Sequence, residues 1–330
     1  MLQERLGSDL STNRTWNSRV KSGDYQTLKN FVRAYSASSP PRLLIFGDSV
    51  WLRAATDDQS PKTLGETLAD FYQRNVCLVF GSGYQPDIFE QYCKLLAKLP
   101  CRPLLVVLPI NLRCFSPTWD LNPLYQFHSE IDLLSSFDVR KPRYKMLNAE
   151  IHSESDSKVI RLESLGAEEI TLQDFQDITR STPKIGSEAW RARLKTIFQY
   201  HYTCPVISTH RKVLSLKRSV RLLRRLGVAV YSYFTPINYE AGVDYSGPSF
   251  RENIDRSIAV IRQELESESR ISSVASGASI VRLDDFSCKF PREVFFTDHN
   301  ATEHLRFEGR DFVARRIVEI DESLIRNDNR

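Results

Sequence analysis

Three side chains of this sequence have the residue types that acyl transfer requires, and each lies next to an apolar or helical segment. Ser49 ends a Gly-Asp-Ser tripeptide that comes directly after the apolar run 43–46. Asn111 ends a second apolar run, and His304 stands a few residues before a helical pattern. An imidazole can take the proton of a serine hydroxyl, and an amide can donate to the oxyanion that then forms. The alternative is ordinary turn chemistry, since Gly, Asp, Ser and Asn are all frequent in turns and helix caps.

Apolar and amphipathic segments alternate along most of the chain. This alternation predicts a mostly parallel sheet with helices on both faces, which is a three-layer α/β/α sandwich. The carboxyl ends of such strands lie at one edge of the sheet, where ligands bind, so the polar residues that follow them are expected to lie together. Strands are expected over 42–46, 76–80, 103–111, 228–238 and 278–286, and helices over 24–35, 62–75, 87–99, 187–202, 210–227, 250–267 and 308–320.

The alternation is interrupted in the middle of the chain, where the sequence is more polar. We interpret residues 120–205 as a largely helical, cap-like insertion. It divides one α/β domain into the segments 42–119 and 206–330, and a helical lead-in over 1–41 precedes that domain. A chain of 330 residues is long enough for this organisation.

The order of the polar residues resembles that of the SGNH hydrolase superfamily, also called the GDSL esterase and lipase group. This resemblance implies a flavodoxin-like fold in which Ser49 is the nucleophile and His304 the base. The backbone N–H groups of Ser49 and Gly83 and the side-chain amide of Asn111 would form the oxyanion hole. Gly81 stands in the same turn, and we prefer Gly83. The resemblance covers residues 42–117 and 228–320.

The sequence departs from that family at the acid of the triad. The family's DxxH motif would place an aspartate where this chain has Ala301, three residues before His304. We prefer Asp298, because a loop with three additional residues can still bring its carboxylate to the imidazole. Glu303 is adjacent to the histidine and would have to turn back on its neighbour. A third alternative is a serine–histidine dyad oriented by a backbone carbonyl. A carboxylate partner would raise the imidazole pKa above its ordinary value of about 6.5.

Two arginines near the predicted site are candidates for substrate binding. Arg53 follows the nucleophile by four residues and Arg113 follows the asparagine by two. Either can reach a phosphate, sulfate or carboxylate group of a substrate. A salt bridge to a nearby carboxylate such as Asp48 or Asp120 is the alternative.

Two further segments have both a structural and a binding interpretation. One is an aromatic run that contains Phe115, Trp119, Tyr125 and Phe127. It can form one side of a sugar-binding cleft, but we favour the interpretation that it packs the insertion onto the sheet. The other is a basic stretch over 210–227 with leucines and valines at helical spacing, which predicts an amphipathic helix with a solvated basic face. Polyanion binding is its alternative. Its basic residues are Arg211, Lys212, Lys217, Arg218, Arg221, Arg224 and Arg225.

Composition narrows the functional classes. Hydrophobic residues make up 41% and charged residues 26%, which is typical of a folded globular chain and not of a disordered one. A net charge of +4 does not call for a nucleic-acid partner. The six cysteines form neither a CxxC pair nor a disulfide scaffold, and no leader or membrane span is visible, so we expect buried free thiols and a cytoplasmic location. No metal, phosphate-loop or dinucleotide motif is present, and no cofactor is expected.

The functional prediction is a serine esterase, an O-deacylase acting on a small acyl ester such as an acetylated carbohydrate. An O-acyltransferase would use the same residues, with an acceptor hydroxyl in place of water. A non-catalytic carbohydrate-binding or assembly module is the third alternative. The displaced acid favours that module, and the intact Ser49, Asn111 and His304 argue against it.

Overall fold

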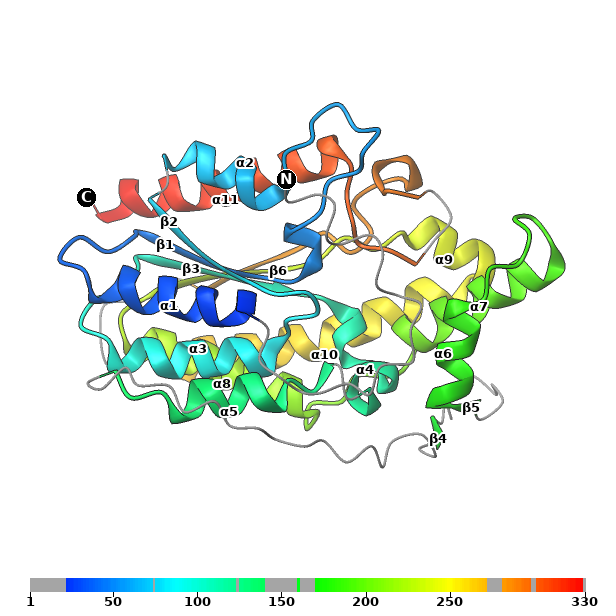
Figure 1. Ribbon diagram of the computed structural model, residues 1–330, viewed down its shortest axis with the longest axis horizontal. Coiled ribbons are helices and arrows are strands. Elements are labelled where there is room, and N and C mark those ends of the chain that lie inside the picture. Colours follow the sequence, from blue (N-terminus) through cyan, green and yellow to red (C-terminus); the bar gives the residue numbers. More distant parts are fainter. Residues whose placement is uncertain are drawn as a thin grey trace.

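A five-stranded parallel sheet forms the centre of the fold (Figure 1). The strands pair in the order β2-β1-β3-β6-β7, and every neighbouring pair is parallel. They are β1 (Leu43–Gly47), β2 (Val76–Phe80), β3 (Leu105–Ile110), β6 (Ala229–Phe234) and β7 (Val281–Asp285). The computed structural model describes residues 22–73, 75–122, 125–139, 159–160, 170–271, 281–297 and 301–328.

Each strand lies within or overlaps a predicted one, and the central strands β1, β3 and β6 are buried at every position because both faces of the sheet are covered there. In β1, Leu44 and Phe46 pack into one hydrophobic core, while Leu43 and Ile45 pack into the core on the opposite face. All four side chains are fully buried. A strand between two helical layers needs apolar residues at every position, which gives a continuous run in place of alternation. The predicted three-layer α/β/α class is confirmed.

Helices form the two outer layers (Figure 1). The N-terminal helix α1 contributes Leu28, Phe31 and Tyr35, which are fully buried in the same core as the sheet. The helix of the predicted lead-in is therefore packed on the α/β domain, and residues 1–21 lie outside the described part. One face carries α1 (Ser22–Ser36), α3 (Pro86–Lys98), α8 (Arg211–Arg225) and α10 (Ser249–Ile271), and the other carries α2 (Leu64–Phe71) and α11 (Phe307–Asp328).

The predicted insertion is largely helical where it is described. Its helix α7 places Phe198 and Tyr202 in the core beside the sheet, so the insertion is packed against the α/β domain. Residues 140–158 and 161–169 lie outside the described part. The described elements between β3 and α8 are η2 (Leu112–Phe115), α4 (Pro117–Leu121), α5 (His128–Ser136), β4 (Val159–Ile160), β5 (Ile170–Thr171), α6 (Leu172–Arg180) and α7 (Glu188–Tyr202); α9 (Tyr239–Ser246) follows β6.

The basic face of α8 is exposed at Arg211, Arg218, Arg221 and Arg225, as predicted, and much of it is also ion-paired, which the sequence did not predict. Arg218 donates two hydrogen bonds of 2.8 and 2.7 Å to Glu90 of α3. Arg221 donates two of 2.8 and 2.6 Å to Glu268 of α10. Lys212 is fully buried and is paired as well. These carboxylates come from helices that are distant in sequence, which is why the basic pattern alone does not reveal them.

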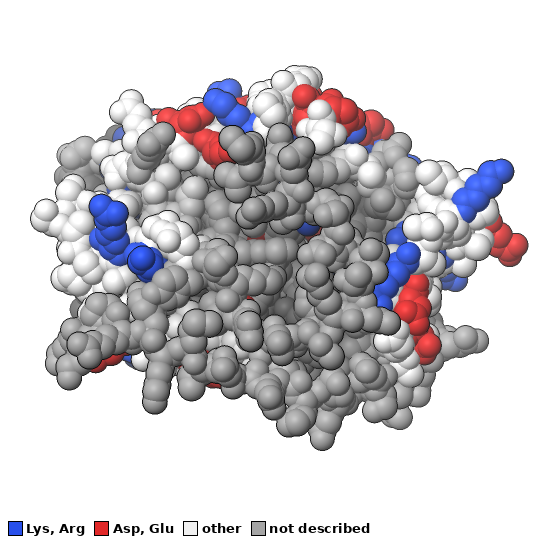
Figure 2. All heavy atoms as spheres, in the orientation of Figure 1, with Lys and Arg blue, Asp and Glu red and all other residues white. Residues whose placement is uncertain are grey.

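Acidic and basic side chains are intermixed on part of the described surface (Figure 2). Figure 2 shows acidic and basic side chains next to one another at the upper and right-hand margins of one face.

All six cysteines are free, as the sequence predicts, and three of them are buried. None of the described helices is both long and apolar enough to cross a membrane.

The strand order determines where a site can form. The chain runs outward from β1 to β2 and then returns past β1 to β3, so the connections after β1 and β3 leave the sheet in opposite directions. The carboxyl ends of those two strands form a topological switch point, which is where ligands of such folds bind. Ser49 directly follows β1 and Asn111 directly follows β3. The two residues therefore meet at the switch point.

Candidate active site

The nucleophile candidate stands on a tight turn between β1 and the short 3-10 helix η1 (Ser49–Trp51). A Cβ atom at Gly47 would lie only 2.5 Å from the ring of Trp51, so glycine is required where that ring covers the strand end. Asp48 accepts a 2.9 Å hydrogen bond from the N–H of Val50, which fixes the turn. The Gly-Asp-Ser tripeptide is therefore turn chemistry, and the turn presents Ser49 at the edge of the sheet.

The structure brings Ser49 and His304 into hydrogen-bond contact. The Nε2 atom of His304 lies 3.1 Å from the Oγ atom of Ser49, and both residues are half-buried. His304 is positioned by its own backbone, because its carbonyl accepts a 3.0 Å bond from the N–H of Phe296 and the next residue forms a β-bridge to Phe295. The nucleophile and base predicted from the sequence thus have the geometry that proton transfer requires.

The acid predicted from the sequence does not appear in the described part of the site. Asp298 lies outside the described residues, as does His299. Glu303 is turned away from the imidazole, because its carboxylate forms a 2.5 Å salt bridge with Arg113 and accepts a hydrogen bond from the hydroxyl of Tyr202. In the described part of the chain, the His304 ring has a hydroxyl as its second partner: Thr302 Oγ1 lies 3.1 Å from Nδ1.

The amide of Asn111 is held in one orientation by two neighbours. Its Nδ2 donates a 2.8 Å hydrogen bond to the buried carboxylate of Asp48, and its Oδ1 accepts one of 3.0 Å from the N–H of Arg113. These bonds assign the oxygen and nitrogen of the amide unambiguously. The second hydrogen on Nδ2 finds no acceptor among the described residues. Asn111 thus has one donor to offer to a ligand beside Ser49.

Gly83 stands in the turn that follows β2, beside the end of β1. The N–H of Tyr84 donates to the carbonyl of Gly81 at 3.1 Å, and Gly83 has φ +80, as the third position of a type II turn requires. The N–H of Gly81 donates to the carbonyl of Gly47 at 3.4 Å, which ties the turn to the strand of the nucleophile. Within the described ranges, the N–H groups of Gly83 and Ser49 have no acceptor.

The two arginines predicted to bind substrate differ in their surroundings. Arg113 is largely buried; besides its salt bridge to Glu303, it donates to the carbonyl of Ala301 at 2.8 Å and to Tyr202 at 3.2 Å. The salt-bridge alternative therefore applies to Arg113, with a partner that the sequence did not indicate. Arg53 is exposed and has no ion-pair partner in the described part of the chain.

The aromatic run after β3 packs internally, as the favoured interpretation predicts. Trp119 and Tyr125 stack with ring centroids 4.1 Å apart and planes at 14°, and Phe127 meets Tyr84 edge to face. A Cβ atom at Gly83 would lie 3.1 Å from the Tyr125 ring. The aromatic residues thus support the turn that carries Gly83.

Electrostatics keep His304 neutral. Burial is the largest cause, and the positive charges of Arg113 and Arg53 add to it, so the pKa of His304 falls to about 3. This direction is opposite to the one that a carboxylate partner would give, and Asp298, the partner preferred from the sequence, lies outside the described residues. A base must be neutral to accept a proton, and a lowered pKa keeps it neutral over a wider range of pH.

Replacing Arg53 with glutamine is expected to move the acid limb of the pH profile. In the unaltered protein, kcat/KM for p-nitrophenyl acetate should stay high well below pH 6.5, because the neutral imidazole persists there. Removal of a nearby positive charge raises the imidazole pKa, so the limb of Arg53→Gln should lie at higher pH. The difference should shrink in high salt, since Arg53 is exposed. Coincident limbs for the two proteins at low salt would contradict this account.

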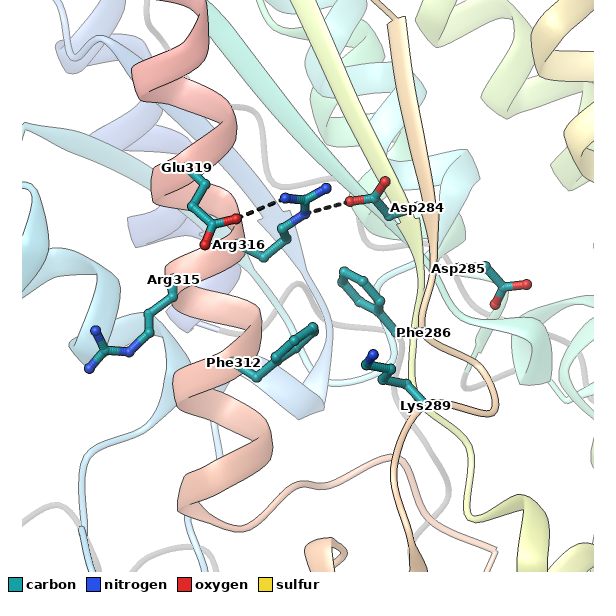
Figure 3. A pocket seen from close by; sticks show the side chains of 8 residues that line it. All are labelled: Asp284, Asp285, Phe286, Lys289, Phe312, Arg315, Arg316 and Glu319. Carbon is teal, nitrogen blue, oxygen red and sulfur yellow. Dashed lines mark hydrogen bonds and ion pairs between the residues drawn. The ribbon is translucent and has the colours of Figure 1, made fainter.

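A separate pocket of about 420 Å³ lies between β7 and α11 (Figure 3). Arg316 crosses it, at 2.8 Å from both Asp284 and Glu319, and Lys289 lies over the ring of Phe312. Its charged groups largely neutralise one another, and it has no nucleophile–base pair. Its lining residues are Asp284, Asp285, Phe286, Lys289, Phe312, Arg315, Arg316 and Glu319.

Comparison with protein-family models and with curated proteins gives no match to this chain. A function is therefore inferred from the geometry of the site.

Two contacts in the site were not predicted from the sequence: the contact of Asp48 with Asn111 and the contact of Thr302 with His304. Asp48 carried a signal, since a charged residue at the end of a buried strand needs a partner. A threonine two residues before a histidine carries none. The described residues include no cluster of three or more His, Cys, Asp or Glu that could hold a metal ion.

Proposed function

We propose that the protein is a serine hydrolase of the SGNH type, which removes a small acyl group from an ester through an acyl-serine intermediate. The observation that supports this most directly is the 3.1 Å contact between Ser49 Oγ and His304 Nε2. A binding module has no need of a nucleophile in contact with a neutral imidazole. The amide of Asn111, oriented next to that contact with one hydrogen to donate, supports acyl transfer in particular.

Acylation begins with the transfer of the Ser49 proton to His304 Nε2. As the proton leaves, Oγ attacks the ester carbonyl carbon, and the carbonyl π electrons move onto the oxygen. The N–H groups of Ser49 and Gly83 and the Asn111 amide stabilise this oxyanion, at about 3 kcal/mol for a well-placed donor. The tetrahedral intermediate then collapses, and His304 returns its proton to the leaving alcohol oxygen.

Deacylation repeats these steps with water in place of Ser49. His304 takes a proton from water, hydroxide adds to the acyl carbon, and Ser49 leaves with the proton that His304 returns. An acceptor alcohol in place of water would give acyl transfer by the same residues. Product analysis with and without an added sugar acceptor distinguishes the two reactions.

We further propose an ester with an anionic group, such as an acetylated acidic carbohydrate. Arg53 supports this, because it lies two residues after the end of η1 and is an exposed cation without a described ion-pair partner. Its charge acts on His304, which places it near the reacting atoms. Arg113 is not included, since its charge is used by Glu303.

A fluorophosphonate probe tests the proposal directly. Attack by an activated serine expels fluoride and leaves a stable phosphonyl ester, so peptide mass spectrometry should locate the adduct on Ser49. Ser49→Ala should remain unlabelled, and Ser208→Ala, a control at an exposed serine, should label at the rate of the unaltered protein. Labelling at a different serine, or no labelling of a folded sample, would overturn the proposal.

A further inference from the structure

The second nitrogen of the His304 imidazole faces a hydroxyl group. Thr302 Oγ1 lies 3.1 Å from His304 Nδ1 and also accepts a 3.1 Å hydrogen bond from the backbone N–H of His304. A hydroxyl oxygen has two acceptor positions and one donor hydrogen. The backbone N–H occupies one acceptor position, so the hydroxyl meets Nδ1 either with its second acceptor position or with its hydrogen.

The direction of this hydrogen bond decides whether His304 can act as a base. If Nδ1 carries the proton and donates it to Thr302, then Nε2 is free to accept the proton of Ser49. If the threonine hydroxyl donates to Nδ1, then Nε2 carries the proton and cannot accept another. The active tautomer is therefore the one in which Thr302 is the acceptor.

The described carboxylates that adjoin His304 and Ser49 in sequence already have other partners. Glu303 is bonded to Arg113 and Tyr202, and Asp48 accepts hydrogen bonds from Asn111 and from the N–H of Val50. Among the described residues, the charged side chains that lower the pKa of His304 are Arg113 and Arg53. The hydroxyl of Thr302 is the described side-chain group in contact with Nδ1.

The two residues that flank Thr302 both contact a single guanidinium group, one through its backbone carbonyl and the other through its side chain. Arg113 donates to the carbonyl of Ala301 at 2.8 Å and forms a salt bridge with Glu303 at 2.5 Å. The residues before and after the threonine are thus tied to the same largely buried side chain. A hydroxyl held in this way stays in place when the imidazole gains and loses a proton.

We propose that Thr302 is the positioning residue of the base and takes the place that an acidic residue has in a triad. Its hydroxyl accepts Nδ1–H, selects the tautomer in which Nε2 can deprotonate Ser49, and adds no negative charge. The inference depends on the proposed function. The sequence instead favoured Asp298 as the partner of the imidazole. The assignments to Thr302 and to Asp298 predict different results for substitutions of these two residues.

Three substitutions of Thr302 test this role, with p-nitrophenyl acetate and the fluorophosphonate as probes. Thr302→Val removes the hydroxyl at nearly constant volume and is expected to lower kcat and the labelling rate about 10- to 100-fold, with KM little changed. Thr302→Ser keeps the hydroxyl and should restore most of the rate. Thr302→Asp places a carboxylate at Nδ1, which raises the imidazole pKa and should move the acid limb of kcat/KM to higher pH.

Two results would overturn the inference. One is a Thr302→Val protein with the kcat of the unaltered protein. The other is an acid limb that does not move in Thr302→Asp while Asp298→Asn loses at least 100-fold, which would assign the acid to Asp298. Either result counts only if the fluorophosphonate labels Ser49 in the unaltered protein. If Ser49 is not labelled at all, the proposed function itself fails, and the two failures can therefore be told apart.

Discussion

Ser49→Ala and His304→Ala are each expected to lower kcat for p-nitrophenyl acetate by about 10⁴-fold or more. Without the hydroxyl there is no acyl acceptor, and without the imidazole the hydroxyl keeps its proton. Because the two groups act as a unit, the double variant should be no slower than either single variant. Initial rates, corrected for the folded fraction, provide the measurement.

The controls for these variants are an exposed histidine and an exposed serine. His128, on α5, contacts Gln126 and not the site, so His128→Ala should keep the full rate. Ser208→Ala should do the same. If Ser49→Ala retained substantial turnover, the reaction would not pass through an acyl-serine. In that case the binding-module alternative would have to be reconsidered.

Asn111→Ala is expected to lower kcat by about 10²- to 10³-fold, with KM nearly unchanged. The amide donates to an oxyanion that exists in the transition state and not in the bound ester, so its loss affects kcat. A second effect concerns stability, because the buried carboxylate of Asp48 loses a donor at a cost of about 1–3 kcal/mol. Thermal unfolding, measured beside kcat per folded molecule, separates the two.

The opposite pattern would show that Asn111 has a structural role only. A lowered melting temperature with an unchanged kcat per labelled site would mean that the amide holds Asp48 and contributes nothing to the oxyanion. Titration of active sites with the fluorophosphonate gives the required normalisation, since it counts the competent Ser49 side chains directly.

The strands and main helices were predictable because each is a local pattern. The continuous apolar run of β1 and the turn residues after it define both the strand and its end. The pairing of α8 was not predictable in the same way. Glu90 and Glu268 contact its arginines only after α3 and α10 pack beside it, and no pattern within 210–227 encodes that arrangement.

In the candidate site, too, local sequence predicts some features, whereas others depend on tertiary packing. Ser49, Asn111 and His304 follow from their positions next to strand and helix ends, which is sequence information. The orientation of Asn111 by Asp48 and the burial that lowers the His304 pKa depend on the strand order and on packing. The sequence also placed Arg113 near the site correctly but not its salt bridge, because Glu303 reaches it from 190 residues further along the chain.

The 255 positions that separate Ser49 from His304 have a consequence for synthesis of the protein. A ribosome adds about 5–20 residues per second, so Ser49 is synthesised roughly 13–50 seconds before His304. If the proposed function holds, the nascent chain lacks its base throughout that interval and should have no esterase activity. The base arrives just ahead of α11, the helix that covers one face of the sheet with α2. Esterase activity would therefore report the last stage of assembly, and a lag between completed synthesis and activity would time the docking of that helix.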